Sequence, residues 1–329
     1  MEINMRKILL ASTALVAVAG ISAANAEITF SGNSAIGYST WSDDVTDNTT
    51  AGENGTAVLT DTDMAASWST TTDTGLTLSV SYDLDSPSSS GSLAGDFGTI
   101  SWDDGQEAMG VGGGDADAVT LMGNVGDNTI AYSGGETIEG GNIAYSNTIG
   151  GIAFGIGIGN GGAADDANET SYGVSYSSSV NGADVSLSYA AASEGHENTA
   201  AATTDASSTS MTVGVSVGSI GLDVAQNTSK TTRFDDNASG AGYADMKSTN
   251  IGLSYTVTDS LTVTAASVAA SGTITTNADY KYDEAAYGID YTIASGVALS
   301  AGFSDWSQTG GGQTDVSGTG TKIRLKVSF

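Results

Sequence analysis

The chain ends with Thr321-Lys322-Ile323-Arg324-Leu325-Lys326-Val327-Ser328-Phe329, which alternates strictly between apolar and polar side chains. One face carries Ile323, Leu325, Val327 and Phe329, and the other carries Lys322, Arg324 and Lys326. A period of two residues predicts a β-strand with one apolar side. If that side contacts lipid, the three bases line the lumen of a barrel, because each would cost about 2–4 kcal/mol near the middle of a bilayer. A soluble edge strand protected by lysines is the alternative.

The same alternation recurs along the chain, for example in 76–84, 211–217 and 287–293. It predicts sixteen strands, which begin near residues 27, 63, 75, 97, 128, 141, 151, 170, 183, 209, 220, 247, 260, 284, 296 and 319. This spacing allows roughly 19 residues for each strand and its connection, which suits membrane strands of about 9–11 residues.

The connections between these strands alternate in length. Short ones, such as Val180-Asn181-Gly182, Ser219 and Asp259-Ser260, are typical of tight turns. The long ones, rich in Asp, Asn, Thr and Gly, cover 42–62, 103–127, 160–169, 191–207, 230–246, 271–283 and 305–318. Such sorting predicts an all-β, transmembrane, antiparallel β-barrel with turns in the periplasm and loops outside. A secreted β-sandwich or β-solenoid would also alternate, and remains the alternative.

The first 26 residues have the pattern of a cleaved signal peptide. Arg6 and Lys7 precede an apolar run over residues 8–19, and Ala24-Asn25-Ala26 provides a cleavage site. The apolar run is too short to span a bilayer. We therefore expect a leader over 1–26 and a barrel domain over 27–329, whichever of Met1 or Met5 is the initiator.

The overall charge excludes several classes of function. The 329 residues include 9 Lys and Arg against 38 Asp and Glu, so the net charge of −29 would repel nucleic acid. Cysteine is absent, which excludes disulfides and thiolate metal sites. The single histidine, His196, lies in a hydrophilic stretch that we expect to be a loop. We therefore expect no catalytic site and no enzyme activity.

Three stretches carry a resemblance to a known family. They are Glu27-Ile28-Thr29-Phe30-Ser31-Gly32, then Gly95-Asp96-Phe97-Gly98-Thr99-Ile100-Ser101-Trp102, and the terminal strand ending in Phe329. In this order they resemble the alphaproteobacterial general porins, sixteen-stranded trimers of the Rhodobacter type. The resemblance implies an outer-membrane homotrimer, a third loop folded into the lumen, and a carboxyl-terminal aromatic residue, Phe329, that the barrel assembly machinery recognises.

The resemblance places the inward loop after Trp102. The loop over 103–127 carries Asp103, Asp104, Glu107, Asp115, Asp117 and Asp127, and no base. Carboxylates across a narrow aqueous passage attract cations and oppose anions. The family sets such carboxylates against bases on the wall, but here no Lys or Arg occurs between Lys7 and Lys230. We therefore expect a cation-selective constriction; a solvated external loop is the alternative.

The predicted function is passive diffusion of small hydrophilic solutes and ions across the outer membrane of a Gram-negative bacterium. Expected partners are outer-membrane lipid, lipopolysaccharide and the barrel assembly machinery, with no resident cofactor. Paired carboxylates such as Asp43-Asp44 and Asp235-Asp236 suit loosely bound Ca²⁺ at the acidic loops. Lys230, Arg233, Lys247 and Lys281 are expected in or beside long loops. A secreted or cell-surface structural protein, S-layer or adhesin-like, and a substrate-specific channel are the alternative functions.

Overall fold

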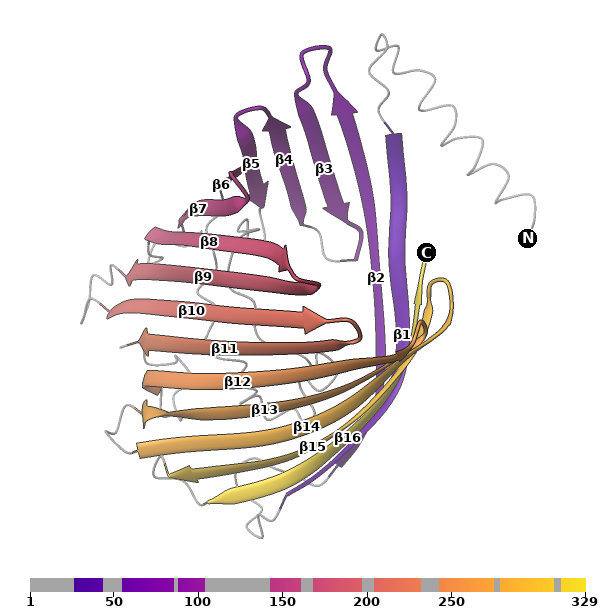
Figure 1. Ribbon diagram of the computed structural model, residues 1–329, viewed down its shortest axis with the longest axis vertical. Helices are drawn as coiled ribbons and strands as arrows, with labels where there is room; N and C mark the ends of the chain where they lie inside the picture. Colours follow the sequence, from indigo (N-terminus) through magenta and orange to yellow (C-terminus); the bar gives the residue numbers. More distant parts are fainter. Residues whose placement is uncertain are drawn as a thin grey trace.

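The computed structural model describes residues 27–43, 55–85, 88–103, 143–160, 168–196, 204–231, 243–274, 279–310 and 315–329. They form a closed barrel of sixteen antiparallel strands, each paired with its neighbours in the sequence. The strands follow one another around the wall until β16, in yellow, lies beside β1, in indigo (Figure 1). The predicted all-β antiparallel barrel is confirmed, and its closure excludes the sandwich and the solenoid. No helix in the described part of the chain is long and apolar enough to cross a membrane.

The strands differ greatly in length. They are β1 (Glu27–Asp43), β2 (Gly55–Thr71), β3 (Thr77–Asp83), β4 (Ser89–Gly95), β5 (Gly98–Asp103), β6 (Ile143–Ile149), β7 (Ile152–Asn160), β8 (Asn168–Val180), β9 (Ala183–His196), β10 (Thr204–Val217), β11 (Ile220–Thr231), β12 (Tyr243–Thr258), β13 (Leu261–Ile274), β14 (Asp279–Ala294), β15 (Val297–Gly310) and β16 (Val316–Ser328). Strands β3 to β7 have 6 to 9 residues and are here called the short wall. Strands β8 to β16 have 12 to 16 residues and are called the tall wall.

The register distinguishes the two faces of the barrel. Directly paired residues point to the same side of a sheet, so a face can be followed from strand to strand. One face carries large apolar side chains that are exposed, such as Ile251, Leu253 and Tyr255 on β12, at 45%, 47% and 46%. The opposite face carries mainly Gly, Ser, Ala, Asn and Asp. An apolar outside and a polar inside are the arrangement of a transmembrane barrel.

Tight turns join the strands at one rim, as the alternating connection lengths predict. Between β8 and β9, for example, Asn181 and Gly182 have φ of 53° and 81°, the left-handed conformation that a two-residue hairpin turn requires. At the other rim most connections are longer, up to residues 104–142 between β5 and β6. Three connections at that rim are short, namely residues 84–88, 275–278 and 311–315.

The number of strands agrees with the prediction, but the strands are not the same sixteen. Strand β4 (SSGSLAG) was not predicted, because Leu93 is its only large apolar residue and no period of two is visible. A strand was predicted near residue 128, which lies outside the described residues. Strand β5 pairs directly with β6, so the barrel closes without it.

The end of the chain closes the barrel beside β1. The Gly32 N–H donates to the Phe329 carbonyl at 3.1 Å, and the Phe329 N–H donates to the Gly32 carbonyl at 3.0 Å. A β-carbon at position 32 would lie 2.9 Å from Cζ of Phe329. The glycine therefore makes room for the terminal ring, which packs on the outer face and stays 70% exposed. The leader predicted for 1–26 lies outside the described residues.

Candidate functional site

The polar face of the barrel wall is the candidate site, and its bases lie on one strand. The structure places Lys322, Arg324 and Lys326 on the face of β16 opposite Ile323 and Val327, whose side chains are 47% and 40% exposed on the outside. The three bases therefore form one column along the lumen face. Among the described residues, no other base lies on that face.

The neighbours of this column are all small. The bases pair with Gly302, Ser300 and Ala298 on β15 and with Ser39, Gly37 and Ala35 on β1. At position 37 a β-carbon would lie 2.7 Å from the Ile323 carbonyl oxygen and 3.5 Å from Cβ of Arg324. Small residues on both sides thus leave lateral space for three long, mutually repelling side chains.

Carboxylates flank the basic column on both sides. On one side Asp290 (β14) pairs with Ser300, which pairs with Arg324. On the other side Asp61 (β2) pairs with Ala35, which pairs with Lys326. Each carboxylate is two strands away from a base, about 10 Å at the usual strand spacing. This is the separation of the backbones, and in the described part of the chain no ion pair joins these side chains, so their charges act through the field along the wall.

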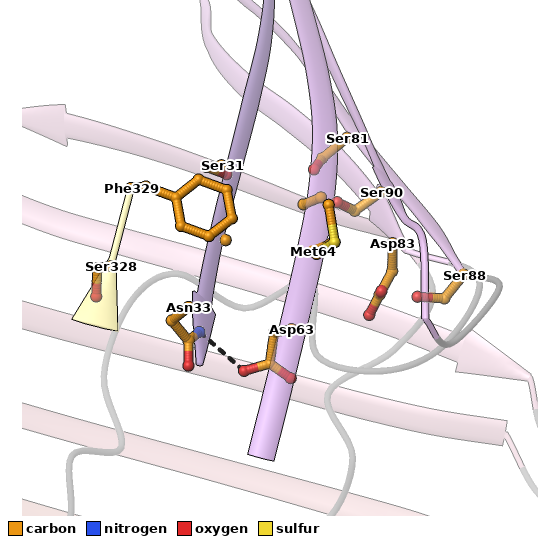
Figure 2. Close-up of a pocket in the computed structure, with 12 residues that line it drawn as sticks. Ser31, Asn33, Asp63, Met64, Ser81, Asp83, Ser88, Ser90, Ser328 and Phe329 are labelled. Atoms are coloured by element: carbon orange, nitrogen blue, oxygen red, sulfur yellow. Dashed lines mark hydrogen bonds between the residues drawn. The ribbon is translucent and has the colours of Figure 1, made fainter. Parts of the chain in front are cut away.

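A polar hollow of about 500 Å³ lies next to the seam, on β1 to β4 (Figure 2). The Asn33 side-chain amide donates to Oδ2 of Asp63 at 2.8 Å, and Asp83 faces the same hollow. Its other polar lining comes from Ser31, Ser81, Ser88, Ser90 and Ser328. In the adjoining connection, a hydrogen bond with the Asp83 side chain raises the pKa of Asp85 above its ordinary value.

A second hollow, of about 570 Å³, lies near the turns that join β8 to β12. It is lined by Asp184, Asp223 and several serines, and the Ser179 hydroxyl donates to Asp184. On the lumen face of the described wall, the carboxylates therefore lie in several sectors, whereas the bases occupy one strand. Within the described ranges, no group of three or more His, Cys, Asp or Glu side chains is arranged to hold a metal ion.

An apolar cluster covers part of the lumen face of the tall wall, towards the loop rim. Met246, Tyr280 and Tyr282 are only 6%, 2% and 6% exposed. Tyr282 stacks on Trp306 with ring centroids 6.4 Å apart, and its hydroxyl donates to Glu284 at 2.9 Å. Side chains of this size on the wall of an open, water-filled lumen would be exposed.

The predicted acidic loop is almost entirely outside the described residues. Asp103 is the last residue of β5, where it pairs with Ser90. Asp104, Glu107, Asp115, Asp117 and Asp127 all fall within 104–142. The sequence interpretation did not select the wall carboxylates Asp61, Asp63, Asp83, Asp184, Asp223, Glu284 and Asp290. The sequence pattern could have identified two of them, because Asp83 and Asp290 each occupy a polar position between apolar residues of an alternating strand.

Two loop boundaries were placed inside the strands. Lys230 and Lys281, predicted within the connections 230–246 and 271–283, lie on strands β11 and β14, because the tall wall continues past its apolar residues. Lys247 lies on β12, in agreement with the strand predicted to begin near it. One assignment to a loop was also wrong. His196 is the last residue of β9, paired with Thr204, rather than a loop residue. Arg233 lies outside the described residues.

Comparisons with known proteins agree with this architecture. Among solved structures, the chain is similar to outer-membrane expressed OmpT of Vibrio cholerae (14% identity, 94% of this chain and 99% of that chain, TM-score 0.66). It is also similar to an anion-selective porin from Comamonas acidovorans (15%, 93% and 100%, 0.65) and to a trimer form of in-vitro folded OmpT of Vibrio cholerae (13%, 92% and 99%, 0.60). At these identities the likeness shows the fold alone.

A comparison with curated protein sequences found no significant match. The sequence model of one family, described as Gram-negative porin, matches residues 11–318. This match covers nearly the whole chain and agrees with the closed sixteen-stranded barrel. The chain therefore belongs to the Gram-negative porin family, and it is an outer-membrane β-barrel channel.

Proposed function

We propose that this outer-membrane channel is filled with water and passes small hydrophilic solutes and ions by passive diffusion, with a preference for cations. The distribution of charge on the lumen face carries the proposal. Carboxylates occur there on β2, β3, β9, β11 and β14, whereas the bases are confined to β16. A lumen with an excess of carboxylates concentrates cations and excludes anions.

The comparison with the porin from Comamonas acidovorans sharpens the proposal. That protein is anion-selective and has the same fold. Selectivity must then be set by the side chains of the lumen, and the fold by itself does not determine it. In this chain the basic column is the single feature of the described lumen that favours anions.

Reversal potentials in a KCl gradient test the proposal. We expect single-channel recordings of the refolded chain, residues 27–329, to give discrete conductance steps. The sign of the reversal potential should be the one that indicates preferential passage of K⁺ over Cl⁻. Replacing the basic column (K322Q/R324Q/K326Q) should strengthen the cation preference, because it removes the anion-attracting charges. The paired variant D61N/D290N should weaken it. Anion preference in the unmodified channel would contradict the proposal, as would the absence of conductance steps.

We further propose that the acidic loop over 103–127 enters the lumen and forms its constriction. The apolar cluster on the tall wall supports this, because its burial requires chain to lie against it. The loop leaves the wall at β5, and β13 is eight strands from β5 in a barrel of sixteen, hence on the opposite side. A loop that crosses the lumen from β5 would reach this cluster.

Neutralising loop carboxylates tests the constriction. We expect D115N/D117N to lower cation selectivity, because the charges lie where the passage is narrowest. The matched control is D235N/D236N, which removes the same charge from the connection between β11 and β12 and should have little effect. Equal effects of the two variants would mean that the loop over 103–127 is not the constriction.

We propose that the protein is a homotrimer with its contacts on the short wall. A membrane-spanning strand needs about 9–11 residues, and β3 to β6 have 6 or 7. A wall too short for the bilayer needs protein against its outer face. The trimer form of the related OmpT supports the oligomeric state. Native mass spectrometry should give a trimer, and a monomer at all concentrations would refute it.

We propose that Phe329 is the signal read by the barrel assembly machinery. Its ring is 70% exposed at the membrane surface of the last strand, where a receptor can reach it. Phe329→Ala should reduce the amount of barrel assembled in the outer membrane while the purified chain still refolds in detergent. Val327→Ala, on the same face, is the control. Equal loss in both variants would argue for a general packing effect.

A further inference from the structure

Among the described strands, β2 has one edge that is without a partner along half of its length. Strand β2 pairs with β1 from Gly55 to Ser69, but with β3 only from Ala65 to Thr71. It therefore continues well past the end of β3 (Figure 1). No described residue pairs with this side of β2 over 55–63. We call residues 55–63 the free edge, and Asp63 its foot.

The free edge presents a row of backbone hydrogen-bonding groups. Next to its foot, the Met64 carbonyl accepts from the Leu84 N–H at 2.8 Å, and the Met64 N–H donates to Oδ1 of Asp85 at 3.3 Å. The N–H and C=O groups of Met64 thus point to the side of β3, and those of every second residue beyond it point the same way. These residues are Thr56, Val58, Thr60 and Thr62, and all four are exposed.

An exposed edge of this kind is a template for another strand. Edges are commonly protected by Pro, by Lys or by a bulge. Residues 55–63 contain neither Pro nor Lys, and their pairing with β1 has no register shift. The outer side of the edge carries Val58, which is 70% exposed, and the polar hollow of Figure 2 lies at its foot. The free edge is therefore suited to an added strand.

The segment that fits this edge is Asn128-Thr129-Ile130-Ala131-Tyr132-Ser133. It belongs to the connection between β5 and β6, which leaves and re-enters the short wall. The sequence predicts a strand there, and this strand lies outside the described residues. Its alternation puts Ile130 and Tyr132 on one face and small residues on the other, as in the strands of the barrel. Beside β2, the two large side chains would continue the outer face next to Val58.

The length of the connection sets the direction of the segment. Ile143, where β6 begins, is level in register with Trp68, five residues or about 17 Å from the foot. A strand in line with β3 is three strand spacings, about 14 Å, from β6. The ten peptide links from Ser133 to Ile143 span at most about 33 Å. They suffice if Ser133 lies near Asp63, but fall short if the segment runs the other way. The segment must then run parallel to β2.

We propose that residues 128–133 of the same chain pair with the free edge, parallel to β2, and extend the short wall beyond the end of β3. The pairing provides partners for the N–H and C=O groups of the edge. It also holds the far end of the acidic loop over 103–127 beside β2, while β5 holds the near end. The inference goes beyond the channel function and does not depend on which ion the channel prefers.

Engineered disulfides test the pairing, and the absence of native cysteine removes any background. Directly paired residues share a face, and their Cα atoms are about 5 Å apart, as a disulfide requires. With T60C on the outer face, we expect I130C or Y132C to cross-link at least about fivefold more than A131C, because a strand puts them on opposite faces. With D61C on the lumen face, the order should reverse.

Non-reducing denaturing gels identify the source of the added strand. A disulfide within one chain keeps the mass of the monomer and changes its mobility, which is the expected result. A covalent dimer would mean that a second copy occupies the edge, and would overturn the inference. Equal yields for I130C, A131C and Y132C would also overturn it, because they indicate no strand. The control I130C/S271C, with Ser271 on the outer face of β13, should not cross-link.

Hydrogen exchange tests the same pairing without cysteines. The amides of Thr56, Val58, Thr60 and Thr62 should exchange slowly in the unmodified protein. A131P should speed their exchange at least about tenfold, because Pro has no N–H and interrupts a strand. A116P, in the same connection but outside the segment, should leave it unchanged. Fast exchange in the unmodified protein, or no response to A131P, would contradict the pairing. Neither experiment reads the reversal potential, so their outcome is separate from that of the proposed selectivity.

Discussion

The short wall and the tall wall belong to one closed sheet but differ in the length of their strands. Within the described residues, strands β3 to β6 have 6 or 7 residues, fewer than the about 9–11 that span a bilayer. Strands β8 to β16 run for 12 to 16 residues and continue beyond it. The added length carries Lys230, Lys247 and Lys281 on the outer face and the apolar cluster on the lumen face. Strand length, more than side-chain pattern, therefore separates a wall suited to a neighbouring subunit from one suited to lipid.

The strongest test of this difference places a charge on each wall. Leu253→Arg puts a cation in the apolar band of the tall wall and should lower the free energy of unfolding by about 2–4 kcal/mol. Leu93→Arg on the short wall should instead leave a folded monomer that does not form trimers. Urea unfolding in lipid vesicles and native mass spectrometry measure the two effects. An equal loss of unfolding free energy in both variants would mean that lipid contacts both walls.

The next test concerns packing within the short wall. The Trp102 ring occupies the space where a β-carbon of residue 91 would lie. Gly91→Ala should therefore cost about 1–3 kcal/mol of unfolding free energy, because the ring has to move. Ser92→Ala, one residue away on the lumen face, should change it by no more than about 0.5 kcal/mol. Similar changes in unfolding free energy for the two variants would mean that the Trp102 ring moves aside at no cost.

A smaller effect is expected from the partly buried hydrogen bond between Tyr282 and Glu284 on the tall wall. Tyr282→Phe removes the hydroxyl that donates to Glu284 at 2.9 Å and leaves the stacking on Trp306 in place. Since the group is buried, the loss should be about 1–1.5 kcal/mol in urea unfolding. A loss near zero would show that water reaches Glu284 and that the cluster is open to the lumen.

The smallest effect is expected in the hollow of Figure 2. Asn33→Ala removes the 2.8 Å hydrogen bond to Asp63, but water can replace the amide in this exposed site. The unfolding free energy should fall by less than about 0.5 kcal/mol. A fall as large as that of Tyr282→Phe would mean that water does not replace the amide, and that the hollow is no more hydrated than the apolar cluster.

The alternation of side chains alone determined the class of fold. Strands such as β12 and β16 put an apolar residue at every second position, and the repetition of this pattern with short turns between predicts a membrane barrel. The pattern could not find β4, because Gly91 and Gly95 occupy positions where a large apolar residue would mark a strand. There the Trp102 ring of the next strand covers the glycine, and a neighbour of this kind is invisible in a one-dimensional pattern.

Charge placement was decided by the tertiary structure. The sequence by itself determined that carboxylates greatly outnumber bases and that three bases alternate with apolar residues on the last strand. Asp61 is hundreds of residues away from the bases in the sequence, and strand β15 lies between Asp290 and the bases. Only the register could therefore show that both carboxylates lie two strands from those bases. It also showed that Lys230, Lys247 and Lys281 share the outer face. The physical reason is that the period of a strand determines which of its residues share a face. Barrel closure and strand length determine which neighbouring strands, lipid or water that face contacts.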